Sequence, residues 1–493
     1  MNIAPRSAQL LDRIDAIRRG VGDDFRDAFV TSVYREARDV AREVVRATER
    51  KTWDRKLDRL LTHPIWGWPL MLFVLAMVFW VTVVGANVPS GLLAGLLMEQ
   101  GGLTEWLSAH FGLEAPAFVS MSLYEILHRG FAAVGAPSWL SGMLVDGVYL
   151  CLAWVVSVML PPMAIFFPLF TLLEDLGYLP RVAFNLDPLF RKAGAHGKQA
   201  LTMSMGFGCN AAGVIACRII DSPREKLIAI LTNNFMICNG RFPTVIAIAT
   251  LLVAAHVSSG WLTATVAAGT VVMVVLSGIG IMFLCSWALS RTVLRGEASA
   301  FALELPPYRR PAILRVIYTS LIDRTLFVLC RACCVAAPAG LVIWCVANVE
   351  VGGAPMARYL IDALEPIGWV MGLSGVILLA YVIAIPANEI VVPVIIMLLI
   401  LTGGDAGLGL ERGRLVEPGA EGLLAMFDAN GWTIMTGVCL LSFVLLHNPC
   451  GTTIWTIWKE TRSLRWTAFA TVMPLALGVV TCTVIAATWR WLR

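Results

Sequence analysis

The chain has 493 residues, of which 58% are hydrophobic and only 15% are charged. Soluble domains average about 45–50% apolar and about 25% charged residues, so this chain has too few polar side chains to cover a water-soluble globule. The net charge of +4 is too small to indicate a nucleic acid as a partner. The composition therefore excludes a soluble enzyme and a disordered chain. It predicts an all-α, polytopic membrane protein, because the apolar stretches approach or exceed the about 20 residues that a helix needs to cross a bilayer.

Residues 1–60 are charged throughout and form a segment of their own. Val30, Val33 and Val40 recur there at helical spacing with arginines between them, which predicts an amphipathic helix with a narrow apolar seam. We expect a cytoplasmic helical stalk, which either packs on itself or docks a soluble partner. Arginines are frequent before the first apolar stretch and scarce after it, so the N-terminus is expected in the cytoplasm and the loop 87–142 outside.

The apolar stretches predict about eight to ten membrane segments, several of them too short to cross a bilayer alone. The first is expected at 65–84, and a later one is expected as a single span at 367–385. The polar, Gly-rich stretch 403–430 is expected to be a loop. We divide the membrane part into two halves, residues 61–323 and residues 324–493.

Each half contains helices that are interrupted by Gly, Pro and Asn. Leu-Asp-Pro at 186–188 precedes Gly-Cys-Asn at 208–210, and Leu-Glu-Pro at 364–366 precedes Pro-Ala-Asn at 386–388, so the two motifs recur with the same spacing between them. A second interruption follows in each half, at 235–240 and at 447–451. Paired interrupted helices are typical of transporters, in which the freed backbone and side chains bind the substrate near the midplane. Unrelated kinks relieved by neighbouring helices are the alternative.

The interruptions carry side chains that suit a transition metal. Thiols, amides and a carboxylate favour a borderline divalent metal over Mg²⁺ or Ca²⁺, which prefer oxygen ligands alone. A carboxylate inside a bilayer is costly and indicates a functional site. The predicted metal ligands are Cys209, Cys238, Cys450 and Glu389, and the amides expected along the substrate path are Asn210, Asn388 and Asn448. Glu174 and Asp175 end the second span, as an ion exit or as an interfacial cap.

Six short motifs fall in the same order as in the ferrous iron transport protein B (FeoB) family, which the chain resembles over roughly residues 53–490. They are Leu-Glu-Asp-Leu-Gly-Tyr at 173–178, Gly-Phe-Gly-Cys-Asn at 206–210, Phe-Met-Ile-Cys at 235–238, Gly-Glu at 296–297 with Glu-Leu-Pro-Pro-Tyr at 304–308, Asn-Glu-Ile-Val-Val at 388–392, and Pro-Cys at 449–450 with Lys-Glu at 459–460. The resemblance implies two gate-type repeats and Fe²⁺ import across a bacterial inner membrane. It implies gate cysteines at 209, 238 and 450, a second-repeat glutamate at 389, and Fe²⁺ as substrate, with no permanently bound cofactor and no enzymatic activity.

The chain departs from the family pattern in three respects. The family carries an N-terminal GTPase domain, whereas the nearest run to a P-loop here, at 194–199, has the wrong spacing and no hydroxyl. We therefore expect a separate GTPase subunit that docks on residues 1–52, and leave homo-oligomer formation open. Asn388 replaces the family's lysine, and Pro393 and His447-Asn448 are additions near the gates. These changes alter the charge of the site, so Mn²⁺ and Zn²⁺ stay open as substrates.

Two rival functions remain. The first is a permease for a nucleoside or another organic solute, because nucleoside carriers share related repeats. Such a site needs aromatic groups to stack on a base, and only Phe207 and Phe235 lie near the interruptions. The second rival is a membrane thiol–disulfide oxidoreductase that uses Cys330, Cys333 or Cys334. These thiols lie in an apolar stretch without a nearby histidine, which favours a packing role.

Overall fold

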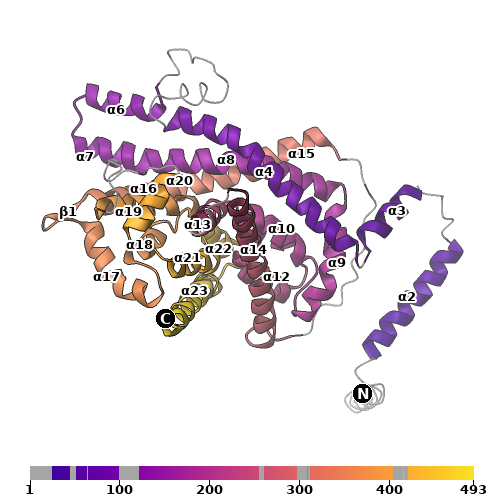
Figure 1. Ribbon diagram of the computed structural model, residues 1–493. Helices are drawn as coiled ribbons and strands as arrows, with labels where there is room; N and C mark the ends of the chain where they lie inside the picture. The colour runs from indigo at the N-terminus through magenta and orange to yellow at the C-terminus, as the bar shows by residue number, and fades with distance from the viewer. Residues whose placement is uncertain are drawn as a thin grey trace, which may run out of the picture. The chain divides into compact units, whose positions relative to one another are not determined.

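The computed structural model describes residues 25–44, 52–63, 65–98, 121–254, 260–296, 308, 311–403, 415 and 420–492. The chain forms two compact units, Met1–Arg59 and Leu60–Arg493. In the first unit, helix α2 (Phe25–Val44) leaves Val30, Val33 and Val40 exposed. Helix α3 (Thr52–Leu61) follows it along the chain (Figure 1).

The second unit confirms the all-α, multi-pass architecture. Six helical segments are long and apolar enough to cross a membrane, namely Gly67–Leu97, Ser138–Asp175, Val266–Arg291, Ile313–Asn348, Ile434–Thr461 and Leu464–Leu492. A bent helix pair and three shorter apolar helices, Asn210–Ile219, Phe242–Leu251 and Asn388–Leu401, add to them. The described strands are only β1 (Glu350–Val351) and β2 (Ala354–Pro355), a hairpin closed by two glycines with positive φ.

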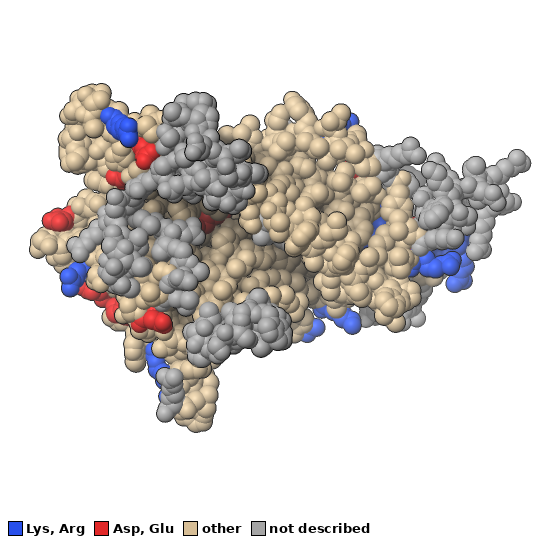
Figure 2. Space-filling model, turned by 45° about the horizontal axis from the view of Figure 1, so that its top comes forward, with Lys and Arg blue, Asp and Glu red and all other residues tan. Residues whose placement is uncertain are grey.

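Large apolar side chains cover much of the outer surface of this unit. Phe73, Met273, Leu284 and Val480, from three different spans, are each at least 60% exposed. Figure 2 shows a face on which uncharged residues dominate and charged side chains lie mainly at the margins. Contiguous apolar surface of this extent is costly in water. The surface therefore matches a protein whose helices contact lipid.

Three sequence expectations about individual segments are wrong. Helix α4 (Gly67–Leu97) continues through the expected start of the outer loop at 87, and the Tyr149 hydroxyl binds its last carbonyl oxygen, that of Leu97, at 2.8 Å. The single span at 367–385 is two helices, α17 (Met356–Val370) and α18 (Gly375–Ile383), that meet at 111°. Gly372 makes this bend possible because its φ of 70° is strained for other residues. Within 403–430, residues 420–429 form helix α20 (Ala420–Ala429).

Helices α6 and α7 lie within the expected outer loop 87–142. Helix α6 (Leu123–Ala133) begins with a capping box, in which Ser122 and Glu125 satisfy each other's backbone N–H groups. Helix α7 (Ser138–Ser141) leads directly into the first repeat. The sequence also predicts a short amphipathic helix at 103–111 of this loop, but these residues lie outside the described ranges.

The remaining helices form two repeats. The first repeat comprises η2 (Gly142–Tyr149), α8 (Leu150–Asp175), α9 (Tyr178–Lys192), α10 (Gln199–Gly208), α11 (Asn210–Ala216), η3 (Cys217–Ile219), α12 (Pro223–Thr232), η4 (Asn233–Phe235), α13 (Phe242–Ala254) and α14 (Gly260–Arg291). After α15 (Ile313–Thr319), the second repeat comprises η5 (Ser320–Leu326), α16 (Phe327–Asn348), α17, α18, η6 (Asn388–Ile390), α19 (Val391–Leu401), α20, α21 (Ile434–Leu446), α22 (Gly451–Thr461) and α23 (Leu464–Leu492).

The constant offset between the two halves of the sequence reappears in the backbone. The offset that separates the Leu-acid-Pro motifs also separates both ends of α9 from those of α17, and the start of the π-helical turn η2 from that of η5. The acidic residue of each motif accepts the same type of hydrogen bond, from a glycine N–H. Asp187 accepts a hydrogen bond from the Gly197 N–H at 3.1 Å, and Glu365 accepts one from the Gly375 N–H at 2.6 Å. Each carboxylate thus ties helix α9 or α17 to the segment that follows it.

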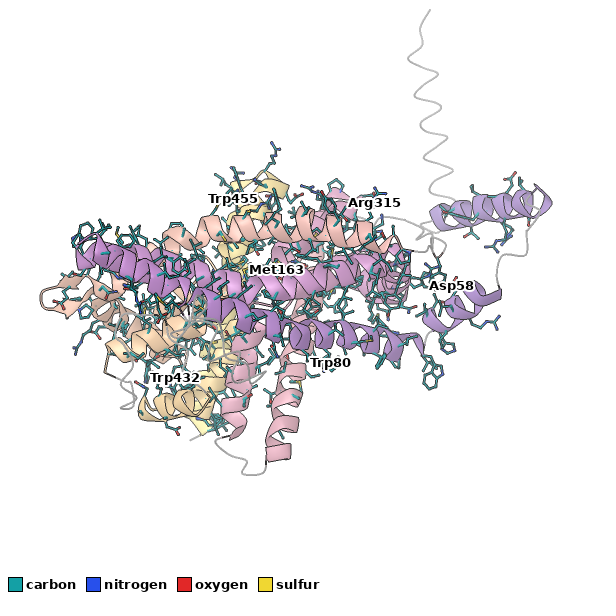
Figure 3. The ribbon with its side chains drawn as sticks, turned by 90° about the horizontal axis from the view of Figure 1, so that it is seen from above. Asp58, Trp80, Met163, Arg315, Trp432 and Trp455 are labelled. Carbon is teal, nitrogen blue, oxygen red and sulfur yellow. The ribbon has the colours of Figure 1, made fainter. Side chains whose placement is uncertain are left out.

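The long helices α8 and α16 pack against each other in opposite directions. Near the start of α8, Gly147 contacts Gly340 near the end of α16, and near its end Thr171 bonds Ser320 of η5 at 3.1 Å. A Cβ atom on Gly340 would collide with the Gly147 carbonyl oxygen, so the helices approach closely because a glycine lies there. Figure 3 shows α8, with Met163 labelled, running along its neighbours. The equivalent helices α8 and α16 of the two repeats therefore run antiparallel, as in inverted-repeat transporters.

Candidate functional site

Four interruptions of the helices meet in the interior of the second unit. We number them as the first break (Cys209), the second break (236–241), the third break (384–387) and the fourth break (447–450). Cys209 is extended, with φ −154° and ψ 124°, between α10 and α11. Ala387, at the matching position of the second repeat, has nearly the same conformation, with φ −147° and ψ 118°. The first and third breaks are therefore equivalent in structure as well as in sequence.

Backbone hydrogen bonds join the two breaks of each repeat. The Asn239 N–H of the second break donates to the Gly208 carbonyl oxygen beside the first break at 3.3 Å. In the second repeat, the Gly451 N–H beside the fourth break donates to the Ile385 carbonyl oxygen of the third break at 2.7 Å. Extended backbone at membrane depth needs partners of this kind, because lipid offers none.

Side chains from all four breaks line one central cavity. The predicted site residues on its wall are Cys209, Asn210, Cys238, Asn388, Glu389 and Cys450. Met159 and Met163 of α8 close another side, together with Val328 of α16. The open volume is about 30 Å³, which is room for only one or two water molecules by the usual measure.

The two repeats meet at the carboxylate of this cavity. Glu389, in η6 of the second repeat, lies directly against Gly240 in the second break of the first repeat, where a Cβ atom would strike the carboxylate. The Cys450 thiol lies 3.2 Å from the Thr453 hydroxyl. Within the described ranges, no three His, Cys, Asp or Glu side chains are close enough together to hold a metal ion. The four predicted ligands thus share a cavity without forming a closed ligand cluster.

Arg241, which the sequence analysis overlooked, holds the second and fourth breaks together. Its side chain is 1% exposed. The guanidinium donates to the carbonyl oxygens of Asn234 (2.9 Å), Leu445 and Asn448 (both 3.3 Å) and His447 (3.4 Å). The Asn234 amide also donates to the His447 carbonyl oxygen, at 2.9 Å.

The reason for a buried arginine here is the end of helix α21. The last carbonyl groups of a helix have no partner within it, and a cation is favoured there by the helix dipole. Pro449 has no N–H, so it cannot bond the Leu445 carbonyl oxygen as the next helical turn would. Arg241 supplies that donor from the other repeat. A lone arginine in the apolar stretch 227–255 was the available signal, since buried charges inside membranes indicate function.

Two of the residues that depart from the family pattern, Asn388 and His447, contact each other. His447 Nε2 lies 3.2 Å from the Asn388 side-chain oxygen, and His447 Nδ1 lies 2.8 Å from the Val444 carbonyl oxygen. The Tyr381 ring meets the imidazole edge-on, with ring centroids 4.9 Å apart. His447 therefore positions Asn388, which is on the cavity wall, although the imidazole itself is not part of that wall.

Three predicted path residues lie away from the central cavity. Asn448 is buried, but its amide donates to the adjacent Pro449 carbonyl oxygen, and its own carbonyl serves Arg241. Glu174 and Asp175 are exposed at the end of α8. Glu174 lines a second, separate cavity and lies 3.5 Å from Arg324.

The family motifs outside the breaks have structural partners. Glu460, with 7% of its side chain exposed, accepts hydrogen bonds from Arg218 of the first repeat at 2.5 to 3.0 Å. The Arg181 guanidinium donates to the Gly177 carbonyl oxygen at 2.6 Å and stacks 4.0 Å from the Tyr308 ring. All twelve cysteines are free thiols, and Cys330 and Cys334 point outward from α16.

The fold and the cavity define a class of protein. This is a multi-pass helical membrane protein in which polar side chains gather where the helices of two inverted repeats are interrupted, an arrangement that transporters use.

Comparison with known families indicates which family within this class the chain resembles. Residues 156–252 match the Gate family model, described as "Nucleoside recognition", and residues 271–323 match the model described as "Ferrous iron transport protein B C terminus". The chain is thus similar to the FeoB family. No solved structure matched the chain.

Curated relatives carry the same family name. An Fe(2+) transporter FeoB of Staphylococcus aureus is 26% identical over 88% of this chain and 58% of its own length. One of Synechocystis is 24% identical over 90% of this chain and 64% of its own length. A Porphyromonas gingivalis protein named as a fusion of Fe(2+) transport protein A and FeoB is 24% identical over 87% of this chain. The chain thus spans between half and two thirds of the length of these relatives.

Proposed function

We propose that this chain is the permease part of an Fe²⁺ importer in a bacterial inner membrane. The observation that carries the proposal is the central cavity, on whose wall thiols from both repeats lie beside the carboxylate of Glu389. Soft and charged ligands of this kind suit a divalent transition metal. The relatives named as Fe(2+) transporters point to iron among those metals.

The open arrangement of the ligands fits transport better than permanent binding. A transported ion has to leave its site, so a cluster that encloses the ion in every conformation would stop conduction. The proposed cycle has Cys209, Cys238, Cys450 and Glu389 bind the ion in turn, while Asn210 and Asn388 supply amide oxygens. Movement at the four breaks would open the cavity first to one side of the membrane and then to the other.

The size of the cavity argues against the organic-solute alternative. Pockets for molecules of that size enclose about 300–1,000 Å³ and have apolar or aromatic walls. The central cavity holds about 30 Å³, and no aromatic residue belongs to its wall in the described structure. A dehydrated cation fits this space, whereas a nucleoside does not.

We further propose that the N-terminus is cytoplasmic and that a separate GTP-binding subunit docks there. The basic residues that follow α8 in the chain, Arg181, Arg191 and Lys192, favour the cytoplasmic side for its end. The exposed valine seam of α2 offers an apolar contact surface for that subunit.

Uptake by the purified chain in proteoliposomes tests the proposed substrate. Under anaerobic conditions, we expect Fe²⁺ to enter faster than into empty vesicles. Excess Mn²⁺ or Zn²⁺ measures selectivity, and a hundredfold excess of nucleosides should leave the rate unchanged. Inhibition by nucleosides, or an Fe²⁺ rate equal to that of empty vesicles with the GTPase subunit present, would overturn the proposal.

A further inference from the structure

A second and larger cavity lies next to the central one. Its open volume is about 250 Å³. Its wall is apolar apart from the Glu174 and Arg324 side chains, which lie 3.5 Å apart and are 49% and 36% exposed. We call this cavity the vestibule. It has room for several water molecules, unlike the central cavity.

One face of helix α8 lines both cavities. Met159 and Met163 belong to the wall of the central cavity, and Phe167, Phe170 and Glu174 belong to the wall of the vestibule. The steps between these residues are four, four, three and four, which is the spacing of one helix face. At 1.5 Å per residue, the face extends about 22 Å from Met159 to Glu174.

Helix α11 follows the same course. It begins at Asn210, on the wall of the central cavity. Ala212 and Ala216 then line the vestibule, as does Ile219 in the following turn. These three positions are again spaced by four and three residues, so a face of α11 and η3 continues from the first break along the vestibule.

Helix α16 supplies the residue at which the two cavities meet. Ala332 belongs to the wall of the central cavity, and Arg324, in the preceding π-helical turn, belongs to the vestibule. Val328 lies between them in sequence and belongs to both walls. Its side chain is 3% exposed.

We propose that the vestibule is the passage between the central cavity and the cytoplasm, with Val328 as the apolar gate between the two spaces. This inference rests on the proposed transport function and adds a route and a gate to it. Apolar constrictions close a pathway because water leaves them, and an ion cannot follow without its water. Small movements of α11 or α16 at Val328 would join the two spaces.

The ion pair at the mouth of the vestibule fits this role. Arg324 is anchored by a hydrogen bond of 3.0 Å to the Thr171 hydroxyl, and its charge balances that of Glu174. A neutral pair retains the released cation less strongly than a lone carboxylate. The vestibule therefore releases the cation to water near Glu174, at the end of α8 where α9 follows.

Substitution of Val328 tests the gate. In proteoliposomes with Mn²⁺ as the transported probe, we expect Val328→Ser to raise passive influx at least threefold, because a polar side chain keeps the constriction wet. Val328→Trp should lower influx at least tenfold by filling the constriction. Val342→Ser and Val342→Trp are matched controls, because Val342 lies on the same helix, is 53% exposed and belongs to neither cavity wall.

A second variant keeps the test decisive if Val328→Trp does not fold. Ala216→Trp fills the vestibule from α11 and should also lower influx at least tenfold. Wild-type influx in Val328→Ser and in whichever folded tryptophan variant is obtained, with Glu389→Gln inactive in the same vesicles, would overturn the passage but leave the proposed transport intact. Absence of Mn²⁺ and Fe²⁺ influx in the wild-type protein with the GTPase subunit present would instead refute the proposed function.

Discussion

Arg241 offers the sharpest test of how the two repeats are joined. In Arg241→Met, the buried carbonyl groups of Asn234, Leu445 and Asn448 lose the donor that Arg241 gives them, whereas that of His447 keeps the Asn234 amide. Each buried carbonyl without a partner costs about 1–3 kcal/mol. Removing the guanidinium also relieves part of its own desolvation cost, so we expect a net loss of about 2–4 kcal/mol.

Thermal unfolding in detergent measures this loss, with tryptophan fluorescence as the signal. For a chain of this size, about 2 °C per kcal/mol is a reasonable conversion, so the Tm should fall by about 4–8 °C. The Tm of Arg241→Lys should lie between those of the wild-type protein and Arg241→Met, because one ammonium group keeps the charge but cannot reach all the carbonyl groups at once. Arg129→Met on the exposed face of α6 is the control. A Tm for Arg241→Met that matches the wild-type value would refute the capping role.

Three further variants test other parts of the structure. Gly340→Leu should lower the Tm by several degrees, because the new side chain collides with Gly147, whereas Gly269→Leu, with open space around it, should not. Glu460→Gln should lower the free energy of unfolding by only about 1 kcal/mol, because Arg218, its partner in the ion pair, is largely exposed. An unchanged Tm would show that the ion pair contributes nothing to stability. Serine in place of Cys330, Cys333 and Cys334 should leave metal uptake unchanged, because these thiols are not on the wall of the central cavity; lost uptake would show that they take part in transport.

The repeat was readable from sequence because its markers are local. Asp187 and Glu365 stand in short motifs with prolines, and both bind a glycine N–H ten residues later. Cys209 and Ala387 interrupt helices at equivalent points because Gly and Pro precede them. Local residue types of this kind predict where a helix stops, so the four breaks were found in the right places.

The contacts between the breaks could not be read in this way. Arg241 binds carbonyl groups in the other repeat, and nothing near it in the chain identifies them. The bend at Gly372 was missed because glycines in an apolar run do not by themselves end a helix. In the sequence, Val328 is an ordinary apolar residue. Its place on the walls of two cavities depends on how three helices pack in the folded structure.

The central claim is that thiols and a carboxylate on the wall of one cavity carry a divalent metal. Anaerobic Fe²⁺ uptake into vesicles by Cys209→Ser, Cys450→Ser and Glu389→Gln measures it most directly, with Cys285→Ser, a buried thiol of α14 outside the cavity wall, as the control. We predict at least a tenfold loss in each of the three variants and wild-type uptake in the control. Wild-type rates in all three cavity variants would contradict the claim.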